Sequence, residues 1–479
     1  MSLDELGIFF MSAFFGAEEI WIRHADDEKE PVLLVGVWET AGKEYASEED
    51  FLHSMDELSE LAGACMMEPM GYVTQQLSKV NNALYVGTGK AEEIREDAEK
   101  MGIQRIIFND TLSPSQIRNL QKMLKLPIMD RTALILEIFE RRARSREAKL
   151  QVELAKLQYL KPRLIGMWET QNRQGGASGA MSSKGEGETQ LEIDRRTIDH
   201  RLAELRRELK EVISDREVRR KKRQGSGTPL VALVGYTNAG KSTIMNAMLE
   251  AYADETVKEE RKVFEADMLF ATLDTTVRRI EPEKGREFLL SDTVGFIHKL
   301  PTALVEAFKS TLEETRDADL LLQVVDASDS HCRDHIEVTK NTIKDLGAGH
   351  IPMITVFNKA DLVHPAMAYP RKGLKEESAG GERNENIYIS AREPYSVTFL
   401  AEAVMEKLDG GNVARDYLIP YDMGSLSSYL MANAVVEKMD YQEAGLFLSV
   451  RCDRVVAEKA DKLLKGESQN EEKRYKRRR

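Results

Sequence analysis

The chain has 479 residues, of which 42% are hydrophobic and 31% are charged, and its formal net charge is −13. This length is enough for three or four domains with separate cores. No apolar run approaches the roughly 20 residues that span a membrane, the acidic start is unlike a secretory signal, and the three scattered cysteines lack a zinc-binding spacing. We therefore expect a reduced, cytoplasmic protein that has no membrane span and is monomeric when soluble.

Residues 1–140 alternate short strand-like runs with helical stretches, which predicts a small parallel sheet. Strands are expected at 32–37, 84–86 and 105–108, with a weaker candidate around Met66, and helices at 48–62, 90–101 and 113–124. The last helix opens with SPSQ, in which a Ser cap precedes Pro at the first helical position and Gln at the third. The GTGK sequence at 87–90 could bind an anion, but we expect a tight turn because the spacing of a phosphate loop is absent.

Two long helices are predicted next, in a basic segment at 141–223. The first is expected over 131–163 and the second around 198–212, each with one narrow apolar seam, as two antiparallel helices packed together require. The seams consist of Leu150, Leu154 and Leu157, and of Ile198, Leu202, Leu205, Leu209 and Val212. The segment contains 22 Lys and Arg against 13 Asp and Glu, so the rest of the chain carries −22. Such segregation is typical of a protein that presents one face to a polyanion; a solvated pair of charged helices is the alternative.

A glycine-rich loop at 175–187 separates the two helices, and a second basic run ends the sequence at 473–479. The loop is too long and too rich in Gly to be a plain helical connector. At the tip of a rigid basic hairpin it is suited to probing a crevice in an RNA surface. On composition alone, a disordered linker is the alternative.

The sequence QGSGTP at 224–229 predicts a linker. The domain that follows, at 230–412, is expected to contain a mostly parallel sheet with helices on both faces. The last segment, 413–479, is expected to form a small α+β domain with strands at 417–419 and 445–450 and a helix at 425–437. The fold class is therefore α/β, with four successive parts.

The sequence GYTNAGKS, from Gly235 to Ser242, fits the phosphate-loop pattern G-x-x-x-x-G-K-[ST]. A buried strand is predicted at 230–234 and a helix at 242–250, so that backbone N–H groups and a helix N-terminus point to one place where polyphosphate can bind. Lys241 would contact the β- and γ-phosphates, and Ser242 would hold Mg²⁺. The flanking strand and helix argue against a chance match in a glycine-rich turn.

The identity of the nucleotide base, guanine, is predicted from the sequence NKAD, which follows an apolar strand at 352–357. In this pattern the carboxylate of Asp361 accepts hydrogen bonds from guanine N1–H and N2–H₂, which adenine cannot supply. Asn358 would brace the site, and the stem of Lys359 would lie along the base. A further strand at 386–389 leads to Ser390-Ala391-Arg392, where a backbone N–H can meet guanine O6.

The hydrolytic end of the site is predicted from two other motifs. A strand at 288–291 leads to the sequence DTVG, in which Asp292 would hold Mg²⁺ through water and the Gly295 N–H would sense the γ-phosphate. Upstream, the sequence FATLD contains Thr272, whose hydroxyl could complete the Mg²⁺ shell in the GTP state. Lys241, Thr272, Asp292 and Gly295 are therefore the candidate catalytic residues, and Ser242, Thr272 and Asp292 the candidate metal-site residues.

Taken together, the motifs predict a GTP site of two dozen residues. These are Gly235, Tyr236, Thr237, Asn238, Ala239, Gly240, Lys241, Ser242, Thr243, Phe270, Ala271, Thr272, Leu273, Asp274, Asp292, Thr293, Val294, Gly295, Asn358, Lys359, Asp361, Ser390, Ala391 and Arg392.

The residue after DTVG departs from many GTPases, because Phe296 occupies the place where a Gln positions the attacking water. A phenyl ring cannot orient water. Slow intrinsic hydrolysis is therefore expected, with the missing group supplied by a partner or by a rearranged loop. His298 and Glu306 are nearby candidates.

Several motifs make the sequence similar to the HflX family of GTPases, within the Obg-like group of translation factors. They are GYTNAGKS, FATLD and DTVGFI in the nucleotide domain, and LSPSQIRNLQ, DRTALILEIF, REAKLQVELAKLQY and GETQLEIDRR before it. The resemblance covers about residues 32–455. The loop sequence ASGAMSSKGE departs from the family, whose loop is usually shorter and carries Arg and Pro.

The resemblance implies a cytoplasmic GTPase that binds the large ribosomal subunit and places its helical hairpin near the peptidyl-transferase centre. It also implies that the GTP-bound protein splits stalled or hibernating ribosomes and that hydrolysis releases it. The leading hypothesis is a nucleotide-dependent conformational switch. The alternative is an assembly or anti-association factor whose main work is binding. A third hypothesis, an RNA-remodelling ATPase that uses the N-terminal domain, depends on the GTGK sequence.

Overall fold

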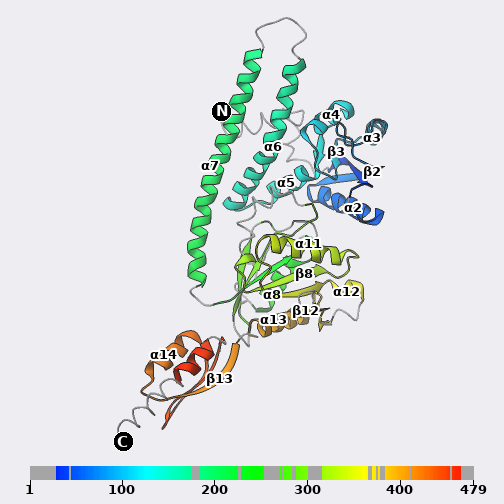
Figure 1. Cartoon of the computed structure of the whole chain (residues 1–479). Helices are drawn as coiled ribbons and strands as arrows, with labels where there is room; N and C mark the ends of the chain where they lie inside the picture. The colour runs from blue at the N-terminus through cyan, green and yellow to red at the C-terminus, as the bar shows by residue number, and fades with distance from the viewer. Residues whose placement is uncertain are drawn as a thin grey trace.

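In the computed structural model the chain forms an N-terminal α/β domain, a long helical hairpin, a central α/β domain and a small C-terminal domain (Figure 1). The structure describes residues 29–42, 45–174, 184–224, 228–252, 269–270, 273, 275–282, 287–299, 315–364, 369–373, 376–377, 383–409, 412–453 and 456–464. Among these residues, no helix has the length and apolar character needed to cross a membrane.

The N-terminal domain contains a four-stranded parallel sheet of order β2-β1-β3-β4, as predicted. Its strands are β1 (Glu30–Glu39), β2 (Met67–Leu77), β3 (Arg105–Phe108) and β4 (Ile128–Asp130), and its helices are α2 (Glu48–Ala64), α3 (Thr88–Met101), α4 (Pro114–Leu124) and α5 (Arg131–Arg142). Alternate side chains of β1 face the two layers: Val32 and Leu34 pack with α2 and α5, whereas Leu33 and Val35 pack with α3 and α4. This burial on both faces explains the continuous apolar run in β1.

One strand prediction in this domain is wrong. The predicted strand at 84–86 is a turn, because Tyr85 has a φ of 66° and the side chain of Asn81 accepts hydrogen bonds from the Ala83 and Leu84 N–H groups. The weaker strand candidate around Met66 is confirmed, since the eleven-residue strand β2 begins at Met67. The predicted helix start at SPSQ is confirmed, with a full capping box between Ser113 and Gln116.

The hairpin consists of α6 (Arg146–Gln174) and α7 (Lys184–Gln224). The expected single helix over 131–163 is wrong: α5 ends at Arg142, Ala143 is extended, and the Ser145 hydroxyl accepts from the Ala148 N–H at 3.1 Å to start α6. The predicted seam is confirmed, with buried Leu150, Leu154, Ile198, Leu202 and Leu205 packed together. Of the glycine-rich loop, 175–183 lies outside the described residues, and the stretch from Lys184 onward already belongs to α7.

The hairpin is fastened to the N-terminal domain by Arg163. Its guanidinium donates to Asp130 Oδ2 and to the Leu112 carbonyl, both at 3.0 Å, and it lies over the ring of Tyr159. Arg163 is 6% exposed and Asp130 is fully buried. A buried, hydrogen-bonded ion pair of this kind sets the direction in which the hairpin leaves the domain.

The central domain contains a sheet of order β10-β12-β9-β8-β5-β7-β6, in which the five inner strands are parallel and the two edges antiparallel. Its elements are β5 (Leu230–Gly235), α8 (Lys241–Tyr252), β6 (Thr276–Ile280), β7 (Phe288–Asp292), β8 (Leu320–Asp326), α11 (Cys332–Asp345), β9 (Met353–Asn358), α12 (Ala360–Val363), β10 (Arg371–Lys372), β11 (Glu376–Glu377), β12 (Arg383–Tyr388) and α13 (Pro394–Asp409). Helices α8 and α13 cover one face and α11 the other. The predicted mostly parallel sheet with helices on both faces is confirmed.

The C-terminal domain is a three-stranded antiparallel sheet of order β13-β15-β14. Its elements are β13 (Asn412–Ile419), α14 (Gly424–Asn433), β14 (Val435–Gln442), β15 (Gly445–Asp453) and a helix at 456–464. The helix predicted at 425–437 ends earlier, at Asn433, because the β-branched Val435 and Val436 pair with β15. The basic run at 473–479 lies outside the described residues.

Candidate nucleotide-binding site

The phosphate-loop sequence connects β5 to α8, as its pattern requires. The Lys241 ammonium donates to the Gly235 carbonyl at 3.1 Å and to the Tyr236 carbonyl at 2.7 Å, so it lies across the loop. Burial lowers the pKa of Lys241 to about 8, although the nearby Asp292 acts in the opposite direction. A buried ammonium of this kind is a strong site for an anion, because a polyphosphate would supply the charge that its surroundings lack.

A hydroxyl and a carboxylate meet beside this lysine. Ser242, at the start of α8, donates to Asp292 Oδ2 at 2.8 Å, and Asp292 is fully buried at the end of β7. Because β5 and β7 are neighbouring parallel strands, their carboxyl ends bring the two side chains together. Both are hard oxygen donors of the type that Mg²⁺ prefers, so the pair fits the metal predicted here.

The DTVG segment runs alongside the phosphate loop. Thr237 N–H donates to the Phe296 carbonyl at 2.8 Å, and Phe296 N–H donates to the Gly235 carbonyl at 3.1 Å. A Cβ on Gly295 would lie 2.8 Å from Thr237 Cα and 3.0 Å from Lys241 Nζ, so only glycine allows this approach. The Phe296 side chain is 2% exposed and packs with Val234 on the face of the sheet that α11 covers, so it belongs to the hydrophobic core.

Asn358 joins three parts of the predicted guanine end. Its side-chain amide donates to the Ala239 carbonyl of the phosphate loop at 3.0 Å, and its carbonyl oxygen accepts from the Ala391 N–H at 3.0 Å. The next residue, Lys359, has a φ of 58° and forms an ion pair with Asp326 at 2.8 Å. Asp361 follows on α12 and is partly exposed.

The structure places most of the predicted GTP contacts at this one edge of the sheet, with five exceptions. Three of them, Ala271, Thr272 and Asp274, lie outside the described residues, as does Glu306, the candidate to replace the missing Gln. Phe270 and Leu273 have their side chains in an apolar cluster with the N-terminal domain, and Phe270 packs edge-to-face on Phe139 with ring centroids 4.7 Å apart.

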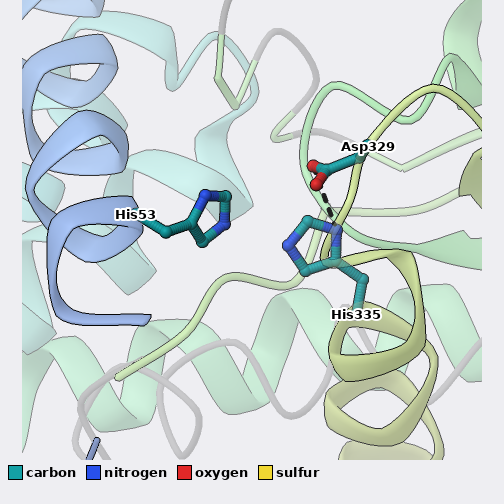
Figure 2. Close-up of side chains that lie close together, drawn as sticks. All are labelled: His53, Asp329 and His335. Carbon is teal, nitrogen blue, oxygen red and sulfur yellow. Dashed lines mark ion pairs between the residues drawn. The ribbon is translucent and has the colours of Figure 1, made fainter. Parts of the chain in front are cut away.

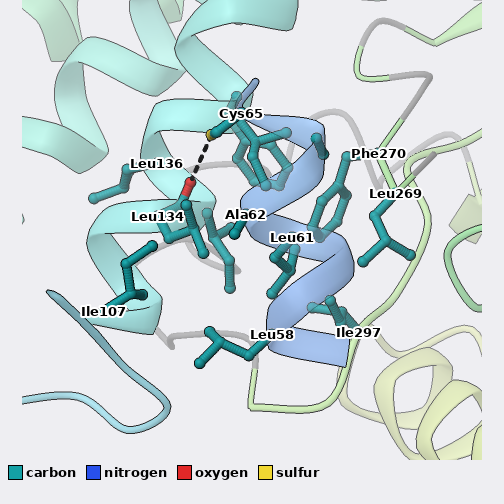
Figure 3. Close-up of a cluster of buried hydrophobic side chains, with 14 of the residues drawn as sticks. Leu58, Leu61, Ala62, Cys65, Ile107, Leu134, Leu136, Leu269, Phe270 and Ile297 are labelled. Atoms are coloured by element: carbon teal, nitrogen blue, oxygen red, sulfur yellow. Dashed lines mark hydrogen bonds between the residues drawn. The ribbon is translucent and has the colours of Figure 1, made fainter. Parts of the chain in front are cut away.

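That cluster joins the two α/β domains directly beneath the phosphate site. Figure 3 shows Leu58, Leu61 and Ala62 of α2 opposite Leu269, Phe270 and Ile297 of the central domain. All of these side chains are at most 3% exposed. Because Phe270 and Ile297 belong to the FATLD and DTVGFI motifs, the segments predicted to respond to the γ-phosphate are packed against the N-terminal domain.

Polar contacts also cross this junction between the two α/β domains, and no sequence motif predicted them. The hydroxyl of Tyr236, in the phosphate loop, donates to Glu57 of α2 and accepts from the His298 N–H at 2.7 Å. Burial raises the pKa of Tyr236 well above its usual value, and the neighbouring Glu57 carboxylate adds to the shift, so the hydroxyl stays protonated. Glu57 is in turn paired with the buried Arg131 of α5.

A second link involves Lys299, four residues after Gly295. Its ammonium forms an ion pair with Asp110 and lies 4.6 Å from the ring centroid of Tyr45, both in the N-terminal domain. Glu57 and Asp110 lie outside the sequence motifs, and Arg131 lies in DRTALILEIF, which does not indicate its partner, so only the folded chain shows that the three residues lie beside the nucleotide site.

Gly240→Ala is expected to weaken nucleotide binding by at least about tenfold, because the new Cβ would lie 2.2 Å from Asn358 Nδ2 and would break its bond to the phosphate loop. Gly347→Ala is the matched control: that glycine also has a positive φ, of 77°, but nothing lies within 4 Å of its Cβ position. Titration with a fluorescent GDP would compare the two. Equal losses would mean that backbone strain, and not the Asn358 contact, matters.

Comparisons with known proteins agree with this geometry. Residues 52–140 match the family model described as GTP-binding GTPase N-terminal, 142–223 match GTP-binding GTPase middle region, and 230–359 match 50S ribosome-binding GTPase. The chain is 40% identical over 432 residues to GTPase HflX of Caldanaerobacter subterraneus, covering 89% of this chain and 93% of that protein. It is 38% identical over 419 residues to GTPase HflX of Escherichia coli, covering 88% and 92%.

Among solved structures, one that resembles the chain is a GTP-binding protein from the hyperthermophilic archaeon Sulfolobus solfataricus in complex with GDP. The identity is 22%, the TM-score is 0.40, and the match covers 80% of this chain and 99% of that one.

Proposed function

Because the chain belongs to the HflX family of GTPases, it binds GTP and hydrolyses it, and we propose that it does so in the cytoplasm as a switch that acts on the large ribosomal subunit. The observation that carries the proposal is the match of residues 230–359 to the 50S ribosome-binding GTPase model. The basic hairpin supports it, because an excess of nine positive charges at 141–223 offers a surface for ribosomal RNA.

In the proposed mechanism, Lys241 and the N–H groups at the start of α8 bind the β- and γ-phosphates. Ser242 and Asp292, which share a hydrogen bond, would hold Mg²⁺, Asp292 through water, and Thr272 would join them in the GTP state. The metal would supply positive charge against the β- and γ-phosphates. Gly295 N–H senses the γ-phosphate from the segment that pairs with the phosphate loop.

The proposed switch acts through the junction beneath the site. The Phe270 and Ile297 side chains pack on α2, so a change in the FATLD or DTVG segments on hydrolysis alters what the N-terminal domain and its hairpin contact. The family suggests one form of this proposal. The GTP-bound protein binds a ribosome and splits it, and hydrolysis then releases the protein from the subunit. The alternative is an assembly or anti-association factor in which hydrolysis serves only for release.

Hydrolysis with and without purified large ribosomal subunits tests the proposal. The rate is expected to rise at least tenfold with subunits, since Phe296 is buried and a partner must complete the site. Deleting 175–187 is expected to keep the basal rate and reduce the stimulation. Equal stimulation with and without those residues would overturn the role of the loop, and no stimulation by any subunit would overturn the ribosomal partner.

Ribosome splitting under a non-hydrolysable GTP analogue separates the two forms of the proposal. Splitting with the analogue but without release of the factor supports the switch. No splitting with any nucleotide, despite binding to the subunit, supports the occupancy factor.

Asp361→Asn is expected to lower GTP affinity by about 10- to 100-fold and leave the phosphate site intact, because the amide cannot accept from both guanine donors as the carboxylate does. Competition between GTP, ATP and xanthosine triphosphate measures the change, since the Asn side chain can donate to the xanthine carbonyl. Asp345→Asn, at the exposed end of α11, is the control. An unchanged preference for GTP in Asp361→Asn would contradict the assignment of the base site.

A further inference from the structure

Three potential metal ligands from both α/β domains converge at the junction, and none of them belongs to the Ser242–Asp292 pair. His53 lies on α2, Asp329 follows β8, and His335 lies on α11. Their ligand atoms all lie within 4.8 Å of one another. Figure 2 shows the His53 ring directed from its helix toward the His335 ring, with the Asp329 carboxylate beside the His335 ring and 3.6 Å from its Nδ1.

We propose that His53, Asp329 and His335 form an interdomain site for a divalent transition metal ion, separate from the Mg²⁺ site. Two imidazoles and one carboxylate are the donor set that proteins use for Zn²⁺ with one position left open. Zinc bonds of about 2.1 Å place tetrahedral ligand atoms roughly 3.4 Å apart, so donors that now lie within 4.8 Å of one another need to close by up to about 1.4 Å. His53 is only partly buried and can make that movement by a small change of its side-chain torsions.

The surroundings suit a metal ion. His331 stacks on His53 with ring centroids 3.8 Å apart, and its Nε2 lies 3.9 Å from Asp50 Oδ1. The neighbourhood therefore gathers imidazoles and carboxylates from both domains.

A metal at this position would connect the N-terminal domain to the phosphate loop. The His335 ring is stacked on the Tyr236 ring, with centroids 3.7 Å apart and an angle of 9° between the planes. Tyr236 in turn donates to Glu57, one turn along α2 from His53. A bond from His53 through the metal to His335 would therefore close a ring of contacts around Tyr236 and hold the two domains together.

The experiment is a titration of the full-length, metal-stripped, nucleotide-free protein with Zn²⁺, followed by calorimetry, and with Co²⁺, followed by its visible absorption. The expected result is one Zn²⁺ per chain and a Co²⁺ spectrum typical of four-coordination. His53→Gln and Asp329→Asn are each expected to weaken binding at least tenfold, whereas His350→Gln, on an exposed turn after α11, is expected to leave it unchanged. The proposal would be overturned if His350→Gln weakened zinc binding as much as His53→Gln does, or if His53→Gln did not weaken it.

Two further measurements distinguish this site from other thiol and imidazole groups. Cys332 is next to His331 in the sequence, so Cys332→Ser is tested as well. If Cys332→Ser abolished zinc binding while His53→Gln kept it, the assignment would be overturned. Hydrogen exchange at 48–64 is expected to slow when Zn²⁺ is added to the wild-type protein but not to His53→Gln. Slowing of equal size in both proteins would show that the metal does not join the domains.

Discussion

Lys241→Met is expected to lower the affinity for GTP by at least about 100-fold. The ammonium is buried against the phosphate loop, where it would make charge-assisted contacts with the β- and γ-phosphates, each contributing about 1.5–3 kcal/mol. A loss of about 2.8 kcal/mol already corresponds to 100-fold. Equilibrium titration with a fluorescent GTP analogue measures this effect. Lys344→Met, which removes an exposed lysine in the last turn of α11, is the matched control.

The same substitution is expected not to destabilise the protein when nucleotide is absent. In that state the ammonium is a buried charge whose burial lowers its pKa to about 8, and a methionine of similar length removes the need to bury it. The midpoint of thermal unfolding should therefore stay the same or rise. A lower midpoint together with lost binding would mean that Lys241 mainly supports the loop through the Gly235 and Tyr236 carbonyls.

Arg131→Met is expected to reduce the free energy of unfolding by about 3–5 kcal/mol, the usual range when one partner of a buried ion pair is removed. The Arg131 side chain is 2% exposed; it pairs with Glu57 and donates to Asn109 Oδ1 at 2.8 Å. Without it, the Glu57 carboxylate stays buried and loses its cationic partner, keeping the hydrogen bond from Tyr236. Denaturant unfolding followed by probes in each α/β domain measures the change, because a multidomain chain does not unfold in one step.

Two comparisons isolate the ion pair. Arg195→Met removes an arginine whose side chain is 63% exposed and pairs with Asp199, itself 45% exposed and one turn away on α7, so its effect is expected to stay below about 0.5 kcal/mol. The double variant Arg131→Met with Glu57→Gln is expected to recover at least half of the lost stability, since no buried charge is left unpaired. A double variant as unstable as the sum of the single variants would contradict the pairing.

The Arg131 variant also addresses the link between the domains. Its guanidinium lies 3.5 Å from the His298 carbonyl, and Glu57 accepts from Tyr236, so the pair sits where the N-terminal domain meets the nucleotide site. Weaker docking is expected to change nucleotide exchange as well as stability. The change in exchange should be absent in Arg195→Met, which removes an exposed arginine of the hairpin helix α7.

The sequence by itself predicted the residues of the candidate nucleotide site and determined much of the sheet that positions them. The phosphate loop, DTVG and NKAD each follow an apolar strand, and parallel strands place their carboxyl ends at one edge, so spacing along the chain was enough to predict Lys241, Asp292 and Asn358 as neighbours. The hairpin seam was equally readable, because its apolar residues recur with the period of paired helices.

Predictions from the local sequence pattern were wrong where contacts between distant residues determine the secondary structure. The turn at Tyr85 was predicted as a strand because its residues are apolar. The start of β14 was predicted as the end of a helix, whereas Val435 and Val436 pair with β15 in the folded chain. The short strand β4 is visible only beside β3.

Only the tertiary structure decided what lies beneath the nucleotide site. Contacts between Glu57 and Tyr236, Asp110 and Lys299, and His53 and His335 join residues more than 175 positions apart, and neither partner belongs to a pattern that names the other. The physical reason is that a motif records the local geometry needed to hold a ligand. The docking of one domain on another depends on complementary surfaces that exist only after both have folded.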